Sequence, residues 1–328
     1  MNDYQDIPYI NTHQWAPQKP RRVWLNILLF LITIITTMMT GASFQGFSWA
    51  AQFENPALIF NGWSYSFVVL LILTTHEFGH YFASLRHRIN VTLPFYIPLP
   101  IPDLFHFGTM GAFIRIKSPI PHRTALMDVA VAGPLAGFVF SLIFLTFGYL
   151  TLPSAEQIMA HVDIVHQRLG ITPEMVKEAA ATLTLGKSTL IWFFNDVIGQ
   201  GKVPMSEIYH FPFIFAGWVG LLVTALNLLP IGQLDGGHVV YALFGYRAKN
   251  LSRIAYGALA GLTVILYYFR GSEATVWVPW MIILAIIGLR HPPTLRDEIE
   301  IDQTRRWLGW LCIAIFFLSF IPLPFHLS

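Results

Sequence analysis

Residues 65–85 read YSFVVLLILTTHEFGHYFASL, and this stretch decides the class of the chain. It continues an uncharged run over 55–76, and about 20 apolar residues in a helix are enough to cross the ~30 Å hydrocarbon of a bilayer. Further uncharged runs lie on both sides of it, at 23–53, 129–155, 208–234, 254–269, 274–289 and 307–328. Because 55% of the residues are hydrophobic and only 12% are charged, the composition excludes a water-soluble enzyme.

These runs predict a polytopic α-helical membrane protein with about six to seven transmembrane helices, folded as one membrane-embedded domain over residues 1–328. The runs within 254–289 are the shortest, since about 16 residues of helix cover only about 24 Å, which leaves open whether they form two full spans or a re-entrant pair. The first span has no convincing small-residue cleavage site, so we expect a retained helix rather than a signal peptide. The expected spans are 23–40, 65–85, 126–150, 212–229, 254–269, 275–289 and 307–324.

The basic residues indicate an orientation. Fifteen of the 20 Lys and Arg residues fall on one side of the membrane when the N-terminus is placed in the cytoplasm. Since short loops rich in Lys and Arg stay cytoplasmic, we expect a multi-pass protein of a bacterial cytoplasmic membrane with its N-terminus inside. The net charge of +2 is small and the basic residues are dispersed, so we expect the lipid bilayer as a partner and no nucleic acid.

Two segments interrupt the helical pattern. Residues 91–121 are rich in Pro, Gly and β-branched or aromatic residues, and 111–117 alternate as in a half-buried strand, so we expect a small β element on the cytoplasmic side. Residues 152–211 are more polar and are expected to form an extracytoplasmic insert, with a helix near 173–183.

The residues HEFGH at 76–80 form an HExxH motif inside an otherwise uncharged helix. One helical turn separates His76 from His80, so both imidazoles share a face and can bind one Zn²⁺, while Glu77 stands beside them as general base. Ionisable residues in hydrocarbon cost at least ~2.5 kcal/mol each by insertion scales, and a bound metal or a water-filled cavity would offset this cost. The motif therefore predicts one zinc ion per chain.

Two histidines leave a catalytic zinc one protein ligand short. The expected helix 212–238 ends in NLLPIGQLDGGH, where Pro230 and three glycines break the helix and free backbone groups. Asp235 and His238 compete for the ligand role there. Imidazole is the commoner zinc ligand, and a carboxylate among glycines also fits a surface turn. Asp235 is nevertheless preferred, because it follows the break and needs a cation at that depth, whereas His238 lies closer to the cytoplasm.

Four motifs together resemble the site-2 protease family of intramembrane zinc metalloproteases. They are HEFGH at 76–80, NLLPIGQLDGGH at 227–238, GTMGAFIRIKSPIP at 108–121 and AGPLAG at 132–137. The resemblance implies that His76, His80 and Asp235 are zinc ligands and that Glu77 is the general base. It also implies an auxiliary role near the site for Asn227. Because no PDZ-like or CBS-like segment is evident, the chain resembles a compact form of the family.

We therefore expect a zinc metalloendopeptidase that cleaves transmembrane helices of membrane-anchored proteins near the cytoplasmic side, as in regulated intramembrane proteolysis. A helical substrate must unwind before its carbonyls can be attacked, and the strand-like residues Phe113, Ile114 and Arg115 are candidates to bind it as an added β-strand. Two alternatives remain open: a zinc-carrying membrane transporter, and a membrane-anchored metallopeptidase that acts on soluble peptides.

Three other features have structural interpretations. Asp128 is expected to cap the start of the third span. His161 and His166, in the polar insert, are expected to be solvated surface residues. Gly133 and Gly137, and likewise Gly257 and Gly261, have the small-xxx-small spacing of closely packed membrane helices.

Overall fold

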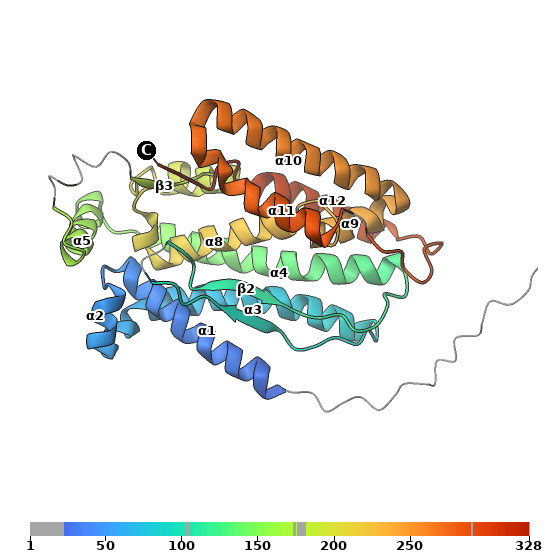
Figure 1. Cartoon of the computed structure of the whole chain (residues 1–328), viewed down its shortest axis with the longest axis horizontal. Helices are drawn as coiled ribbons and strands as arrows, with labels where there is room; N and C mark the ends of the chain where they lie inside the picture. Colours follow the sequence, from blue (N-terminus) through green and yellow to red (C-terminus); the bar gives the residue numbers. More distant parts are fainter. Residues whose placement is uncertain (1–22, 103–104, 173–174, 176–181, 290, 328) are drawn as a thin grey trace, which may run out of the picture.

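The long helices other than α5 (Ala155–Arg168) lie side by side as a bundle, with α5, the short helices and the strands at its edges (Figure 1). The computed structural model describes residues 23–102, 105–172, 175, 182–289 and 291–327. The long helices are α1 (Val23–Phe44), α3 (Trp63–Arg86), α4 (Arg123–Leu150), α5 (Ala155–Arg168), α8 (Pro212–Asn227), α9 (Asp235–Phe244), α10 (Ala248–Arg270), α11 (Trp277–Ile287) and α12 (Gln303–Ser319). The shorter elements are α2 (Trp49–Glu54), η1 (Pro56–Gly62), β1 (Phe95–Pro98), β2 (Thr109–Phe113), β3 (Leu183–Leu185), α7 (Thr189–Trp192), η2 (Phe193–Ile198), η3 (Ile208–His210), η4 (Gly245–Arg247), η5 (Gly271–Val276) and β4 (Phe325–Leu327).

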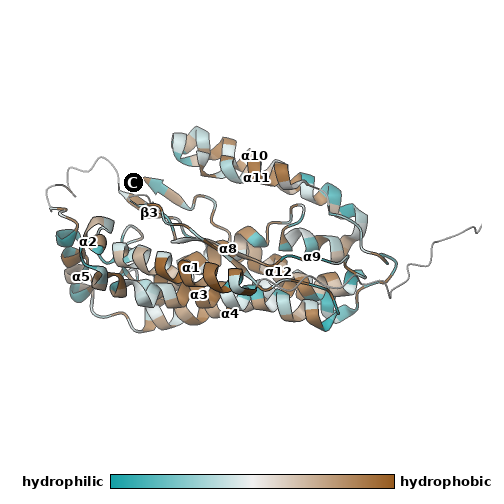
Figure 2. Cartoon of the chain, turned by 60° about the horizontal axis from the view of Figure 1, so that its bottom comes forward, coloured by the Kyte–Doolittle hydropathy of each residue, from teal (hydrophilic) through white to brown (hydrophobic). Residues whose placement is uncertain are grey.

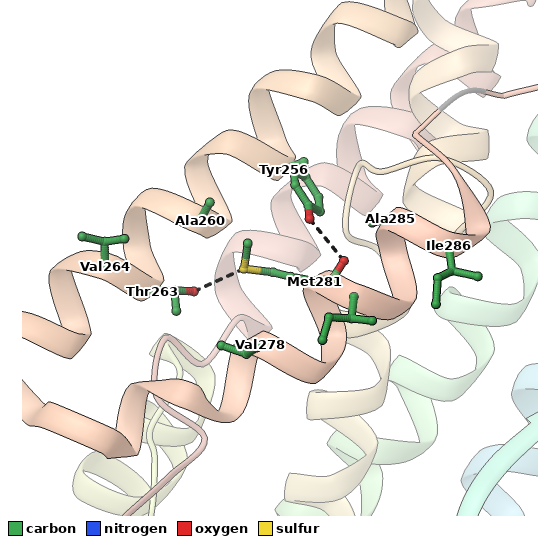
Figure 3. Close-up of a pocket in the computed structure, with 9 residues that line it drawn as sticks. Tyr256, Ala260, Thr263, Val264, Val278, Met281, Ala285 and Ile286 are labelled. Atoms are coloured by element: carbon green, nitrogen blue, oxygen red, sulfur yellow. Dashed lines mark hydrogen bonds between the residues drawn. The ribbon is translucent and has the colours of Figure 1, made fainter.

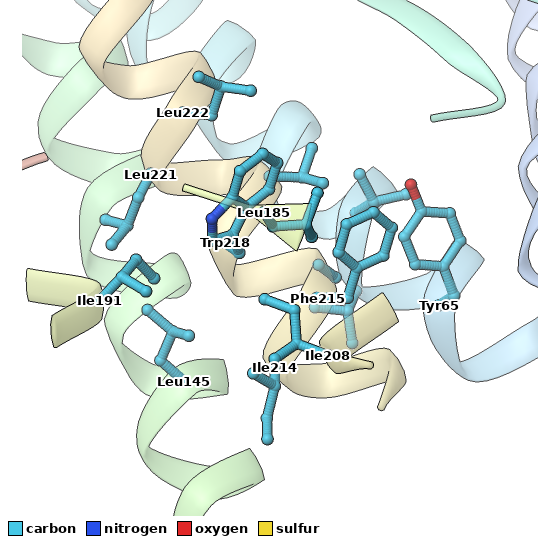
Figure 4. Close-up of a cluster of buried hydrophobic side chains, with 14 of the residues drawn as sticks. Tyr65, Leu145, Leu185, Ile191, Ile208, Ile214, Phe215, Trp218, Leu221 and Leu222 are labelled. Atoms are coloured by element: carbon cyan, nitrogen blue, oxygen red, sulfur yellow. The ribbon is translucent and has the colours of Figure 1, made fainter. Parts of the chain in front are cut away.

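Helices α3, α4 and α8 form the centre of the bundle. Their backbones approach closely at Gly79 of α3, where an added Cβ would lie 2.5 Å from the carbonyl oxygen of Ala132 in α4. Large buried side chains fill the end of the bundle where α3 begins, including Phe215 and Trp218 of α8 and Leu145 of α4 (Figure 4). The close approach and the apolar filling hold these three helices in a fixed arrangement.

Helix α1 has the polarity of a helix in lipid rather than in water. Its threonines face inward, and the Thr37 hydroxyl lies 2.7 Å from the Ser66 hydroxyl of α3, whereas Trp24 and Leu31 are more than half exposed. Hydrophobic residues dominate the middle of α1, α3 and α8, while hydrophilic residues gather at the two ends of the bundle (Figure 2). Four described helical segments are long and apolar enough to cross a membrane: 23–44, 56–86, 123–150 and 235–286. The chain is therefore a mostly helical, multi-pass membrane protein.

The β element predicted within 91–121 is the antiparallel pair β1–β2. It runs along α1 and α3 (Figure 1) rather than lying only at one end of them, since Asn26 donates to the carbonyl oxygens of Leu93 and Pro94 near one end and Tyr65 donates to that of Phe107 near the other. The regular strand also ends at Phe113, earlier than expected. Beyond it the Arg115 amide donates to the side chain of Thr92, which replaces a backbone acceptor and interrupts the ladder.

The NLLPIGQLDGGH segment breaks the chain between two helices, in agreement with the helix break predicted at Pro230 and the glycines. The element expected over 212–238 is thus a helix, a loop and the start of a second helix. Helix α8 ends at Asn227 and α9 begins at Asp235. Pro230 has no amide hydrogen, and Gly232 adopts a φ of +57°, which favours glycine. Gly236 belongs to the first turn of α9, where an added Cβ would lie only 2.0 Å from the carbonyl oxygen of Leu228. These glycines allow α9 to pack against the loop that precedes it.

The insert 152–211 packs against the bundle rather than standing apart from it. Its helix α5 begins with a capping box between Ser154 and Gln157 and buries Ile158, Val162 and Val165, which recur at helical spacing. The helix expected near 173–183 lies mostly outside the described residues. A second antiparallel pair, β3–β4, joins the insert to the C-terminal segment and was not expected.

Residues 254–289 form the hairpin of α10 and α11 on the outside of the bundle (Figure 1). The 11 residues of α11 reach only about 17 Å at 1.5 Å per residue, so α11 alone is too short to cross a bilayer. A pocket of about 520 Å³ lies between the two helices (Figure 3). Its polar contacts are limited to those around Met281, and the lining holds no carboxylate or imidazole, so it is not a candidate for metal chemistry.

Candidate metal centre

Helix α3 presents His76 and His80 on the face that packs against α4. The two residues are one turn apart, both are buried, and their Nε2 atoms lie 3.1 Å apart. The Nδ1 atom of His80 lies 2.7 Å from the carbonyl oxygen of Val129. A carbonyl only accepts, so this nitrogen carries the hydrogen and leaves a lone pair on Nε2, which is the usual arrangement of a metal-binding histidine.

Asp235, the first residue of α9, completes the cluster. Its Oδ2 atom lies 3.5 Å from Nε2 of His76 and 3.3 Å from Nε2 of His80. A tetrahedral zinc ion with bonds of ~2.0–2.2 Å keeps its ligand atoms about 3.3 Å apart. The three atoms therefore have the mutual spacing that zinc requires, and two imidazole nitrogens with one carboxylate are a donor set typical of catalytic zinc.

Two glycines of α4 make room for the imidazoles. A Cβ added at Gly133 would lie 2.1 Å from Nε2 of His80, and one added at Gly137 would lie 3.2 Å from Nδ1 of His76. The interpretation of these glycines as packing residues was therefore incomplete. They keep open the space in which the two rings meet, a role that their spacing alone does not reveal.

Glu77 is buried on α3 next to His76 and faces the β1–β2 hairpin. Its carboxylate lies near the backbone of Ile114 and is close enough to His80 and Asp235 for an electrostatic interaction. A carboxylate beside the metal ligands, but outside the ligand set, has the position that a general base needs.

Asn227 also reaches the cluster. It ends α8, and its side-chain nitrogen lies 3.3 Å from Nε2 of His76. The amide is thus at the edge of the space that the ligand atoms enclose.

His238 contacts the segment before α12 and not the cluster of His76, His80 and Asp235. Its Nδ1 atom lies 2.5 Å from Nε2 of His291, whose Nδ1 donates to the carbonyl oxygen of Pro292. Burial lowers the pKa of His291 to about 4, so this ring is neutral near pH 7 and its Nε2 accepts the hydrogen of His238. The described cluster of metal-binding atoms contains Asp235 and does not contain His238.

Two other sequence interpretations change. Asp128 does not cap α4, whose N-cap is His122. Its carboxylate instead lies 2.7 Å from Nε2 of His87 and 2.7 Å from both Nε and Nη2 of Arg305, and so it ties α3 and α4 to the start of α12. His166 is not a freely solvated residue, because its Nε2 lies 3.3 Å from the Glu207 carboxylate.

The strand candidates lie beside this centre. Phe113 ends β2, and Phe113 and Arg115 are exposed, while Ile114 between them is half-buried with its backbone near Glu77. Of the three, the structure brings only Ile114 into contact with a residue of the candidate site.

Comparisons with known proteins agree with these observations. The 28% identity to the probable zinc metalloprotease EGY1, chloroplastic, of Arabidopsis thaliana extends over 258 residues, which is 77% of this chain and 42% of that protein. The identity to the probable zinc metalloprotease EGY2, chloroplastic, of the same plant is 27% over 298 residues, which is 90% of this chain and 48% of that protein. The chain spans about half the length of the curated relatives that it matches. No solved structure matches it.

These relatives are chloroplastic, so they give no support to the expected bacterial membrane. The sequence model of peptidase family M50 matches residues 64–268, more than half of the chain and the part that contains HEFGH and LDGGH. The resemblance drawn from these motifs is thereby confirmed. The chain belongs to peptidase family M50, the site-2 protease family of zinc metalloproteases.

Proposed function

We propose that this chain is an intramembrane zinc metalloendopeptidase in which His76, His80 and Asp235 hold the zinc ion. The observation that carries the proposal is the spacing of three buried or largely buried ligand atoms, 3.1 to 3.5 Å apart, contributed by two helices that are far apart in the sequence. Without a cation, two imidazole lone pairs and a carboxylate would converge on one point in a low-dielectric interior, which is unfavourable.

Zinc in such a site polarises the scissile carbonyl and activates a water molecule. Glu77 accepts the proton of the attacking water and returns it to the leaving nitrogen, and the backbone of Ile114 lies near its carboxylate. Asn227 presents an amide nitrogen at the edge of the ligand cluster, where it can donate to the carbonyl oxygen as negative charge develops. The auxiliary role of Asn227 is thus to stabilise the negative charge on the carbonyl oxygen of the substrate.

The substrate is a transmembrane or membrane-anchored protein, cut in the cytoplasmic half of the bilayer. In this proposal the chain crosses the membrane six to seven times, with its N-terminus in the cytoplasm. His76 and His80 lie 10 and six residues before Arg86 at the end of α3, or about 15 and 9 Å from that end. A cut in the outer half of a substrate helix would contradict this orientation.

The β1–β2 hairpin is the proposed binding site for the unwound substrate. Unwinding exposes backbone donors and acceptors, and an exposed strand can satisfy them. Ile114 links the two functions, since it continues β2 and its backbone lies near the Glu77 carboxylate. Ile114→Pro removes the backbone amide hydrogen as well as the strand geometry, so Ile114→Ala is the control that keeps the amide. We expect normal zinc in both variants, and cleavage of a transmembrane substrate to fall at least tenfold in Ile114→Pro alone.

The decisive experiment uses Glu77→Gln, which keeps the size of the side chain but cannot accept the proton. We expect full zinc content, loss of turnover, and accumulation of uncut membrane proteins bound to the variant. Glu54→Gln is the matched control, because Glu54 is exposed at the end of α2 and should leave turnover unchanged. Wild-type turnover in Glu77→Gln would overturn the proposed mechanism.

A membrane-anchored peptidase for soluble peptides is separated from this function by substrate preference. The purified protein is incubated with a transmembrane helix in detergent and with the same scissile sequence as a soluble peptide. We expect the helix to be preferred, because the ligand cluster lies among membrane-spanning helices. Preference for the soluble peptide would favour the alternative, and zinc uptake into vesicles without any cleavage would favour a transporter.

A further inference from the structure

A second cluster of metal-binding side chains lies at the opposite end of the bundle. It consists of His166 in the last turn of α5, and Glu207 and His210 at the turn η3 just before α8. The Glu207 Oε2 atom lies 3.3 Å from Nε2 of His166 and 3.3 Å from Nε2 of His210. These distances match the ligand spacing of about 3.3 Å in a tetrahedral zinc site, as in the first cluster.

Hydrogen bonding leaves this cluster unsatisfied. Oε2 of Glu207 and Nε2 of His210 are both buried and have no hydrogen-bond partner among the described residues, although they are only 3.3 Å apart. The His210 side chain is 1% exposed. A buried acceptor without a partner is destabilising, and a metal ion bound by both atoms would remove that cost.

The surrounding backbone sets the tautomer of His210 for metal binding. Its Nδ1 atom lies 2.5 Å from the carbonyl oxygen of Phe44 at the end of α1, so Nδ1 carries the hydrogen and Nε2 presents a lone pair to the cluster. His80 has the same arrangement with Val129 in the first centre. A ring nitrogen fixed by a carbonyl, with the other nitrogen free, is the usual support of a metal-bound histidine.

We propose that His166, Glu207 and His210 form a second binding site for a divalent transition metal of the zinc class. Two imidazoles and one carboxylate suit zinc and related ions rather than calcium or magnesium, which prefer oxygen ligands alone. A proton shared among the three groups could satisfy the charges. A protonated imidazole would pair with the Glu207 carboxylate at 3.3 Å, and the zinc content of the purified protein separates that arrangement from a bound metal.

The second site has a structural role. It joins three separate parts of the chain: the end of α5, the turn before α8 and, through the Phe44 carbonyl, the end of α1. Helix α8 runs from this site to Asn227 beside His76, and its 16 residues place the two centres about 24 Å apart. A metal at His210 therefore stabilises the end of α8 opposite the proposed catalytic centre, and it takes no part in the chemistry.

The test is the zinc content of the purified full-length protein, measured by inductively coupled plasma mass spectrometry. We expect two zinc ions per wild-type chain, one in His166→Ala, one in His80→Ala and none in the double variant. Asp163→Asn is the matched control, since Asp163 is exposed on the same helix and lies outside the cluster, and it should retain two zinc ions. One zinc ion in both wild type and His166→Ala would overturn the proposal, and zinc lost only from the His80 variant would leave the catalytic assignment intact.

A second measurement covers the case in which His166→Ala does not fold. Glu207→Gln preserves the side-chain volume and removes the charge, and it should also bind one zinc ion fewer. In a His80→Ala background, added zinc should raise the melting temperature of the protein and should fail to do so once Glu207→Gln is included. An equal rise with and without Glu207→Gln would place the stabilising ion elsewhere and contradict the proposal.

Discussion

Replacing Gly133 by alanine tests the metal centre through a residue that binds no metal. The added Cβ would lie 2.1 Å from Nε2 of His80, whereas ordinary contacts begin at 3.4 Å, so the ring must move by more than about 1 Å. Zinc ligand distances hold to within about 0.2 Å of their ideal values, so such a movement breaks the site. The ring cannot turn aside without losing its 2.7 Å hydrogen bond to Val129.

We expect purified Gly133→Ala to fold, to lose the one zinc ion of this centre and to lose proteolysis by at least 100-fold. Zinc content and thermal unfolding are measured on the same sample, with two controls. In Gly137→Ala the added Cβ lies 3.2 Å from Nδ1 of His76, and a shift of the ring by a few tenths of an ångström relieves the contact, so this variant should keep most of its zinc. In Gly257→Ala the added Cβ faces open space on α10, and this variant should behave as wild type. Full zinc and full activity in Gly133→Ala would refute the placement of His80 against α4.

Two further predictions concern the same centre, and a third concerns the contact between Asp128 and Arg305. Asp235→Ala should abolish activity and cut zinc content, while His238→Ala should retain zinc and weaken activity less; the reverse metal analysis would make His238 the ligand. Asn227→Ala should lower kcat by roughly 10²–10³ with normal zinc, as for the loss of one donor to a developing oxyanion, and an unchanged kcat would remove its auxiliary role. Asp128→Asn should weaken the pairing with Arg305 and lower the free energy of unfolding by about 1–2 kcal/mol, seen as a lower melting temperature with zinc content unchanged; an unchanged melting temperature would mean that this contact contributes nothing.

The sequence best predicts those features of the site that depend on residues a few positions apart in the chain. HEFGH specifies both its helix and its chemistry, because four residues bring His76 and His80 to one face in any helix. Together with NLLPIGQLDGGH it was enough to predict the family, and the comparison confirmed that prediction. The roles of individual residues, including Asp235 as a ligand, stay predictions that metal analysis must test.

Other features depend on what packs against them. Glycines next to Asp235 predict a helix break, yet Gly236 and Gly237 lie in the first turn of α9. They have no side chains, so α9 can contact the backbone of the preceding loop. The sequence of α5 contains local signals for a helix, namely the capping box from Ser154 to Gln157 and the helical spacing of the apolar residues after it. The cluster of His166, Glu207 and His210 has only a weak signal in the sequence. Glu207 and His210 are three residues apart, but only the tertiary fold brings His166 to them.

The separation of Asn227 from His76 by 151 residues has a consequence for the synthesis of the protein. At 5–20 residues per second, roughly 8 to 30 s pass between translation of HEFGH and translation of the segment that carries Asn227 and Asp235. During that interval α3 enters the bilayer with both histidines and Glu77 but without the partner carboxylate. If the proposed site is correct, metal loading is a late event in biogenesis, and an assembly intermediate arrested before Asp235 contains only the two histidines of the proposed ligand set.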